Sequence, residues 1–194
     1  MFQHEKQQYH DAVYWEQRYE KQPEQFDWYY AYEDLIPQLS FVLHKNHKVL
    51  CIGNGNSIFP VQLYDSFGIT NIIASDISKV VTQQMNSKYN KQGLVFEVDD
   101  ATSSHHASSS FDVVFDKGCT DALQTGAPEL VQKVIDESHR LLKTGGYFLL
   151  ISFGVPYKRL HLFDKEKWDV GIRKLKETEY NEEDYFCYFC KKIQ

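Results

Sequence analysis

The sequence lacks the features of a secreted, membrane-bound or nucleic-acid-coating protein. Its N-terminal residues are polar and charged, and no stretch approaches the roughly 18 apolar residues of a membrane span. Basic residues are not in excess either, because 21 Lys and Arg face 27 Asp and Glu, a net charge of −6. A surface built to hold phosphate backbones is therefore disfavoured. We expect a cytoplasmic protein with no nucleic-acid or membrane partner, present as a monomer or a weak oligomer.

Cysteine is scarce as well, with four residues in a chain of 194. Four scattered thiols are too few for a disulfide framework, which fits a reducing compartment. Cys187 and Cys190 form a C-x-x-C pair, but a zinc site needs a second ligand pair at matching spacing. The pair also lies in an aromatic-rich run that is typical of a strand. We interpret both thiols as packing residues and expect no metal site.

Short apolar runs alternate with segments of helical period, a pattern that predicts an α/β fold with helices on both faces of a parallel sheet. The predicted strands are residues 48–53, 71–77, 94–100, 111–118 and 147–154. Helices are predicted at 8–21 and 27–43, where Pro37 should end or kink the second, and in SIFPVQLYDSF, SKVVTQQMNSKYNK and PELVQKVIDESHRLL. The last of these should stop at Lys143-Thr144-Gly145-Gly146, and ATSSHHASSS should form a loop.

The C-terminal part breaks this alternation. WDVGIRKL and DYFCYFCKK are two strand-like runs separated by the charged segment KETEYNEE, and such a pair favours an antiparallel hairpin at the sheet edge. With no internal repeat and no long linker, we expect one domain over residues 1–194. Residues 1–47 would form aromatic helices that cover a site, and residues 48–194 would form the core.

Glycines and acids follow four successive predicted strands, at the sheet edge where open α/β sheets bind ligands. The first strand runs into Gly53-Asn54-Gly55-Asn56-Ser57, a loop whose glycines let backbone approach a ligand closely. Asp76 ends the second strand about twenty residues after these glycines, a sequence separation that suits an acid binding a ribose diol. It could also cap the next helix. Asp99-Asp100 end the third strand, and Asp116-Lys117-Gly118 end the fourth. This constellation indicates a nucleotide-type cofactor site.

At these residues the sequence resembles a known family. VLCIGNGNS, IIASDIS, FEVDDAT, FDVVFDKGCTDAL and RLLKTGGYFLLIS look like the successive motifs of class I S-adenosylmethionine-dependent methyltransferases. YWEQRY, DWYY, SDISKVV and DKGCTDAL resemble the branch of methyltransferase-like protein thirteen and the lysine methyltransferases of elongation factor 1-alpha. The resemblance runs from about Tyr14 to Ser152. It implies a Rossmann-like seven-stranded sheet of order 3-2-1-4-5-7-6 with strand 7 antiparallel.

The same resemblance implies S-adenosyl-L-methionine as the cofactor and assigns residues to it. Gly53 and Gly55 should meet its methionine part and sugar, Asp76 its ribose, and Ile77 its adenine ring. The other expected cofactor contacts are Asp100 and Ala101 at the adenine edge, Lys117 on the fourth strand, and Trp15, Tyr19 and Trp28 from the N-terminal helices. Packing is the competing explanation for the aromatic residues, because Trp15 and Tyr19 share one helix face. Cys51 and Ser57 depart from the general family pattern.

The resemblance also implies a function, for which composition offers some support. The expected activity is methylation of a protein lysine, with Asp116 or Asp121 guiding the amine. Residues 1–47 hold 4 basic and 8 acidic side chains, and such an acidic rim would suit a basic protein surface. Three alternatives stay open: a small-molecule N-, O- or S-methyltransferase, a nicotinamide-dependent dehydrogenase and a catalytically silent subunit. The dehydrogenase is disfavoured because Ile58 stands where its motif needs a third glycine.

Overall fold

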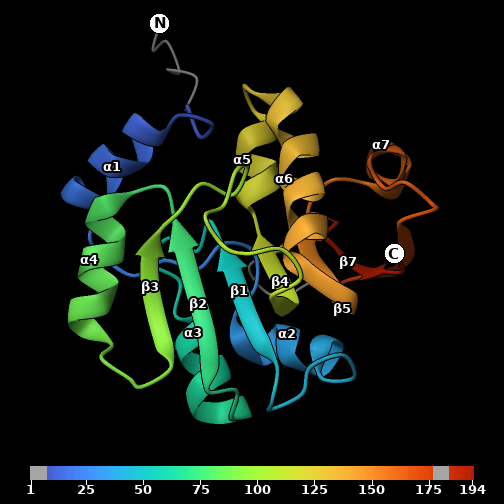
Figure 1. Ribbon diagram of the computed structural model, residues 1–194. Helices are drawn as coiled ribbons and strands as arrows, with labels where there is room; N and C mark the ends of the chain where they lie inside the picture. Colours follow the sequence, from blue (N-terminus) through green and yellow to red (C-terminus); the bar gives the residue numbers. More distant parts are fainter. Residues whose placement is uncertain (1–7, 177–183) are drawn as a thin grey trace, which may run out of the picture.

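The computed structural model describes residues 8–176 and 184–194 of the chain. These residues form one seven-stranded sheet of order β3-β2-β1-β4-β5-β7-β6 (Figure 1). Strand β7 runs antiparallel to both of its neighbours, and the other pairings are parallel. The strands are β1 (Lys48–Ile52), β2 (Asn71–Asp76), β3 (Leu94–Val98), β4 (Phe111–Lys117), β5 (Leu142–Ser152), β6 (Trp168–Lys174) and β7 (Phe186–Lys192). The predicted strand order and the antiparallel seventh strand are confirmed.

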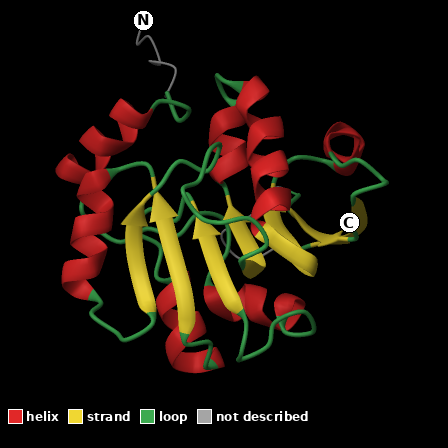
Figure 2. Cartoon of the chain, in the orientation of Figure 1, coloured by secondary structure: helices red, strands yellow, loops and turns green. Residues whose placement is uncertain are grey.

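Helices surround the sheet (Figure 2). The helical elements are α1 (Ala12–Lys21), α2 (Tyr32–Leu39), α3 (Phe59–Gln62), the π-helical turn η1 (Leu63–Phe67), α4 (Lys79–Lys88), α5 (Cys119–Gln124), α6 (Pro128–Leu141), α7 (Pro156–Arg159) and the 3-10 turn η2 (Leu160–Leu162). No described helix combines the length and the apolar character that a membrane crossing requires.

Two hydrophobic clusters, one on each face, hold the helices to the sheet. Side chains alternate along a strand, so Val49 of β1 joins one cluster and Leu50 joins the other. The first cluster includes Leu35 of α2, Phe59 of α3 and Val81 of α4, and the second includes Val134 of α6. A sheet covered on both faces explains the near-continuous apolar runs of its central strands.

The C-x-x-C pair obeys the same alternation. Cys187 packs in the first cluster and Cys190 in the second, and both thiols are free and completely buried. Side chains three positions apart on a strand point to opposite faces, so the two sulfurs cannot share a ligand. The packing interpretation is confirmed.

The largest differences between the predicted elements and the structure lie in α2 and β5. The predicted helix over 27–43 is only α2, and Pro37 lies inside it, two residues before its last residue. Lys143–Gly146, the predicted helix stop, belongs to β5. There the β4–β5 pairing shifts register between Phe111 and Val113, and Gly145 adopts a φ of 85°. The four residues form a bulge within β5. The sequence pattern, a helix followed by glycines and then a strand, does not predict it.

Candidate cofactor site

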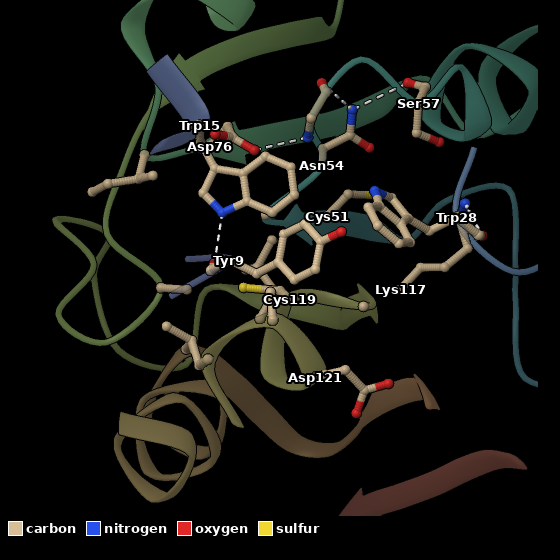
Figure 3. A pocket seen from close by; sticks show the side chains of 18 of the residues that line it. Tyr9, Trp15, Trp28, Cys51, Asn54, Ser57, Asp76, Lys117, Cys119 and Asp121 are labelled. Atoms are coloured by element: carbon tan, nitrogen blue, oxygen red, sulfur yellow. Dashed lines mark hydrogen bonds between the residues drawn. The ribbon is translucent and has the colours of Figure 1, made fainter. Parts of the chain in front are cut away.

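A cavity of about 620 Å³ opens where β1, β2 and β4 end (Figure 3). Strand ends form its floor, and the N-terminal segment that includes α1 forms its cover. Its aromatic lining residues are Tyr9, Trp15, Tyr19, Phe26, Trp28, Tyr29, Phe59, Phe115, Phe153 and Tyr185. Most of these rings precede the first strand in sequence, so the fold brings the N-terminal residues over the predicted strand-end site.

The glycine loop after β1 lines the cavity and is closely packed from two sides. Gly53 and Gly55 have φ values of 53° and 57°, which residues other than glycine rarely adopt. A Cβ on Gly53 would lie 2.6 Å from the Cys119 sulfur, and one on Gly55 would overlap the Tyr19 hydroxyl. Glycine is therefore needed at both positions, because α5 and α1 pack directly against this backbone.

Asp76 joins the glycine loop to the end of β2. Its carboxylate accepts hydrogen bonds from the Gly55 amide at 2.8 Å and from the Ser78 amide at 2.9 Å. Burial raises the pKa of Asp76 to about 6, although these amides oppose the shift. A carboxylate has about four lone-pair positions, so Asp76 keeps acceptor capacity toward the cavity that it lines. Both the ribose role and the capping alternative of the sequence analysis fit this position.

The ends of β2 and β3 form one side of the cavity. Ile77, Asp100 and Ala101 all line it, as expected for residues near an adenine ring. The Asp100 carboxylate accepts hydrogen bonds from the Thr102 amide and hydroxyl at 2.8 and 2.7 Å. Asp99 is buried and binds the following loop, so Asp100 is the more exposed acid of the pair.

The three expected N-terminal aromatics lie together at the cavity. Trp15 stacks on Tyr19 with 5.8 Å between ring centroids, and Trp28 meets Trp15 edge-on at 6.4 Å. The Trp15 indole N–H donates to the Tyr9 carbonyl at 2.7 Å. Only Tyr19 is fully buried, at 5% exposure, so the indoles of Trp15 and Trp28 retain surface that a ligand can cover.

Lys117 lines the cavity, but its ammonium holds the cover in place. Its Nζ donates to the Asp27 carboxylate at 2.8 Å and to the Trp28 carbonyl at 2.9 Å. Burial lowers the pKa of Lys117, while Asp27 opposes the shift. The ion pair fixes the segment that carries Trp28, a role that the strand-end pattern did not reveal.

Two further polar side chains of the glycine loop hold the same segment. The Asn56 amide donates to the Glu24 carbonyl at 2.6 Å and accepts from the Phe26 amide at 3.2 Å. Ser57 donates to Asp27 and accepts from the Phe59 amide at 3.2 Å. Ser57, a departure from the general family pattern, thus joins the cover to the first residue of α3.

The two expected catalytic acids have different environments. Asp116 is completely buried, caps α5 through the Cys119 and Thr120 amides at 2.8 and 3.1 Å, and is not a cavity residue. Burial and repulsion from Asp121 raise the pKa of Asp116 to about 7. Asp121 does line the cavity. Of the pair, Asp121 alone can influence a bound acceptor directly.

Asp121 is the centre of a buried polar cluster that sequence reasoning missed. It accepts from the Ser152 hydroxyl at 2.6 Å, the Phe153 amide at 3.1 Å and the Tyr29 hydroxyl at 3.0 Å. It also forms an ion pair with Arg159, whose exposure is 3%. Arg159 follows β5 in a segment without a motif, so only its position in space identifies it as the counter-ion.

Burial also sets the state of two other groups at the site. Burial and the nearby Asp121 raise the pKa of Tyr29 far above its ordinary value, so Tyr29 stays a phenol and donates. Burial raises the pKa of Cys51 to about 12. Cys51, a departure from the general family pattern, is therefore an apolar wall of the cavity.

Comparison with known proteins identifies this arrangement. The family model described as a methyltransferase domain matches residues 50–150 of the chain. The chain belongs to the methyltransferase domain family. This range contains the glycine loop, Asp76, the β3 end and the β4 end, so the matched residues are those that line the floor of the cavity.

Curated relatives extend the match over most of the chain. The eEF1A lysine and N-terminal methyltransferase of Xenopus laevis is 34% identical over 179 residues, which are 87% of this chain and 26% of that protein. EEF1A lysine methyltransferase 4 of Mus musculus is 28% identical over 195 residues, 94% of this chain and 75% of that protein. The chain thus spans about a quarter of the length of the first of these relatives.

Solved structures agree with the fold. A SAM-dependent methyltransferase from Methanosarcina mazei superposes with a TM-score of 0.66 at 19% identity, covering 82% of this chain and 99% of that one. A TehB-like SAM-dependent methyltransferase from Corynebacterium glutamicum gives 0.64 at 15% identity, covering 93% and 98%. Membership of this family implies S-adenosylmethionine as the cofactor.

The cavity of this methyltransferase domain fits that cofactor. Its volume lies within the range of about 300 to 1,000 Å³ that is typical of small-molecule sites. Asp76 offers a carboxylate to the cavity, and the indoles of Trp15 and Trp28 offer partly exposed aromatic surface. The carboxylate suits a sugar diol, and the indole surface suits an aromatic base.

Proposed function

We propose that the chain transfers a methyl group from S-adenosylmethionine to a lysine side chain of a protein, and that this protein is an elongation factor of the 1-alpha kind. The observation that carries the proposal lies in the part of the cavity lined by Asp121 and Tyr29, which we call the acceptor end. There the buried Asp121 carboxylate accepts a hydrogen bond from Tyr29, a ring of the aromatic wall. The printed names of the curated relatives supply the substrate class. A cytoplasmic location follows from the same proposal.

The acceptor end suits a long alkyl amine. Tyr29 lies against Phe153 and Tyr185, with ring centroids 6.4 and 4.7 Å apart. The rings can pack against the alkyl chain of a lysine, and their apolar surroundings lower the pKa of its amine by disfavouring the charged form. The amine needs this shift, because only the neutral form has the lone pair that attacks a methyl group. The wall thus receives the lysine and helps to prepare it.

The chain's own part in the reaction is alignment and exclusion of water. Bound S-adenosylmethionine supplies an electrophilic methyl group on a sulfonium. Asp121 accepts from four donors, so we assign it the positioning of Tyr29 and of the segment after β5 rather than proton removal. The Lys117–Asp27 ion pair keeps the aromatic cover closed over the cavity.

The expected acidic rim is smaller than composition indicates. Three N-terminal acids serve internal contacts: Asp11 caps α1, Glu16 accepts from Ser78 and the Val80 amide, and Asp27 pairs with Lys117. Glu20 and Glu24 are exposed and remain available to a basic substrate surface. Charge attraction therefore supports the protein-substrate proposal only modestly.

The experiment is methylation of purified elongation factor 1-alpha with labelled S-adenosylmethionine, followed by mass-spectrometric mapping of the modified site. We expect label on a lysine side chain, and less of it with the Asp76→Ala variant when S-adenosylmethionine is limiting. Label on the terminal amine would replace the lysine proposal with N-terminal methylation, the other activity in the name of the Xenopus laevis relative. A cell extract is labelled in parallel, and label confined to its small molecules would establish the metabolite alternative.

Calorimetry with S-adenosylmethionine and with NAD separates the remaining classes. We expect S-adenosylmethionine to bind and NAD not to bind. Cofactor binding without label on protein or metabolites would favour a silent subunit, and binding of NAD alone would favour a dehydrogenase.

A further inference from the structure

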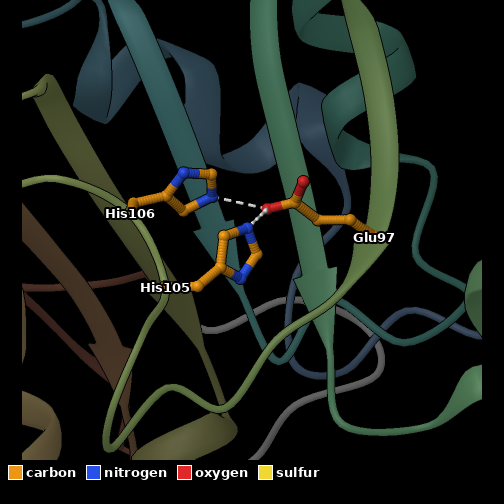
Figure 4. A group of neighbouring side chains, drawn as sticks. All are labelled: Glu97, His105 and His106. Carbon is orange, nitrogen blue, oxygen red and sulfur yellow. Dashed lines mark hydrogen bonds and ion pairs between the residues drawn. The ribbon is translucent and has the colours of Figure 1, made fainter.

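Three potential metal-binding side chains meet at β3, the strand at one edge of the sheet (Figure 4). Glu97 projects from β3, and His105 and His106 come from the loop that joins β3 to β4. The His106 Nε2 lies 2.5 Å from Glu97 Oε1, and the His105 Nε2 lies 3.6 Å from the same oxygen. One nitrogen from each ring and one carboxylate oxygen all lie within 4.8 Å of one another.

A second carboxylate orients His105. The Nδ1 of His105 lies 3.0 Å from the Asp99 carboxylate. Because a carboxylate accepts, the His105 Nδ1–H donates, and the neutral ring keeps its lone pair on Nε2. That lone pair is on the nitrogen nearer Glu97. A carboxylate that holds the far nitrogen of a histidine is the usual support of a metal-bound imidazole.

The loop that carries the histidines is anchored by α6. Arg140 donates to the Ser104 and His106 carbonyls at 3.1 and 2.8 Å, and Glu137 accepts from the Ser104 amide at 2.8 Å. The ring of Phe111 meets His106 edge-on at 5.1 Å. His106 is therefore held by Arg140 at its carbonyl and by Phe111 at its ring, while the His105 ring is held through its Nδ1 by Asp99.

The charge around the cluster favours a cation. The carboxylates of Glu97, Asp99 and Glu137 contact the two histidines or their loop, and one guanidinium, that of Arg140, pairs with Glu137. At neutral imidazoles this leaves two negative charges in excess. A divalent ion at the three ligand atoms would balance them.

We propose that Glu97, His105 and His106 form a binding site for a divalent transition-metal ion of the zinc class. Metal–ligand bonds of about 2.0 to 2.1 Å in a tetrahedral site place ligand atoms about 3.3 Å apart. The observed separations of 2.5 and 3.6 Å bracket this value, so binding requires small side-chain rotations and the shift of the His106 proton from Nε2, where it is donated to Glu97, to the other ring nitrogen. The His105 side chain is 59% exposed, and water can complete the coordination. The ion would link the β3–β4 loop to β3.

Calorimetric titration of the full chain with Zn²⁺, after treatment with a chelator, tests the proposal. We expect one equivalent to bind, with affinity at least tenfold weaker in each of His105→Ala, His106→Ala and Glu97→Gln. Mg²⁺ should not compete, because it prefers all-oxygen ligands. The matched control is His44→Ala/His47→Ala, which removes another adjacent pair of histidine rings, 4.8 Å apart, and should bind as wild type does.

A second measurement separates metal binding from folding. Zn²⁺ should raise the melting temperature of the wild type and of the control, and should leave that of the three cluster variants unchanged. Co²⁺ should give the visible absorption bands of a bound tetrahedral ion in the wild type and in the control. The three cluster variants should lack these bands. Absence of stoichiometric Zn²⁺ binding to the wild type, or its loss in the control instead of the cluster variants, would overturn the proposal.

Discussion

Single residues at the strand ends perform two tasks at once. Asp76 binds the backbone of two loops and also faces the cavity, and Lys117 fixes the N-terminal cover while lining the same space. Buried polar groups are costly unless they are satisfied, so each site residue has partners within the protein. This coupling means that substitutions at the site affect both binding and local order, and tests must separate the two.

Asp76→Ala should weaken binding of S-adenosylmethionine by about 1 to 3 kcal/mol, because it removes ribose acceptors and frees the Gly55 amide. Calorimetry measures the affinity, and a thermal melt shows whether the fold is kept. Asp169→Asn, on the exposed part of β6, is the control and should behave as wild type. Unchanged affinity in a folded Asp76→Ala protein would rule out the ribose role.

Trp15→Ala should reduce cofactor affinity more than it reduces stability, because its indole is only partly buried and lies on the cavity. Tyr157→Ala removes a ring that is 79% exposed and serves as the aromatic control. Fluorescence-monitored melting and calorimetry compare the two effects. A lower melting temperature with normal affinity would mean that Trp15 is a packing residue.

At the scale of elements, the site is an assembly of a loop, two helices and an N-terminal cover. The β1–α3 loop contacts α1 through Tyr19, contacts α5 through Cys119 and holds residues 24–27 through Asn56 and Ser57. The predicted strands placed the loop correctly. The contacts with the cover join residues about 30 positions apart, and no local pattern indicates them.

Gly55→Ala should destabilise the protein by about 1 to 3 kcal/mol, because the new methyl group overlaps the Tyr19 hydroxyl and φ is positive. Tyr19→Phe removes the overlapping oxygen. In a double-mutant cycle the second change should recover part of the loss, measured by chemical denaturation. Strictly additive effects would show that the φ angle, and not the packing of α1, accounts for the destabilisation.

Asp121→Asn should lower kcat for methylation of the protein substrate while leaving cofactor affinity within about twofold. The reason is that Asp121 positions Tyr29 and the segment after β5, and its partners are not cofactor groups. Steady-state kinetics and calorimetry give the two quantities, with Asp169→Asn again as the control. Equal losses of kcat and of cofactor affinity would indicate a general structural defect.

At the scale of the whole molecule, a sheet buried on both faces carries ionisable groups at its carboxyl edge. Burial raises the pKa of Asp76 to about 6 and, with repulsion from Asp121, that of Asp116 to about 7. The ordinary pKa of an aspartate is near 4, so in the native state both groups bind protons more readily than in the unfolded chain. Their contribution to stability is therefore complete at low pH and is lost as pH rises through the folded-state values.

The melting temperature should reflect this loss between about pH 4 and pH 7. Asp116→Asn removes the titrating group but keeps one oxygen for the helix cap, so the decrease from pH 5 to pH 8 should be smaller than in the wild type. Asp169→Asn should keep the wild-type decrease. An unchanged pH dependence in Asp116→Asn would contradict the raised pKa.

The parallel core was predictable because its signals are local. Buried parallel strands are continuous apolar runs, helices carry their own period, and glycine or acid marks each strand end. The bulge of Lys143–Gly146 and the short α2 were not predictable, because pairing with β4 and packing against the sheet decide them. The predicted division of one domain into a cover, residues 1–47, and a core, residues 48–194, stays a prediction.

By itself, the sequence determined the order of elements, the glycine loop and the acids that follow the strands, since each depends on residues near one another in the chain. Tertiary structure decided which acid serves which task. Asp116 and Asp121 look alike in sequence, yet one caps a helix beneath the sheet edge and the other reaches the cavity with Arg159 as its partner. It also brought Glu97, His105 and His106 together. Charges and hydrogen bonds act through space, so only the fold could make these assignments.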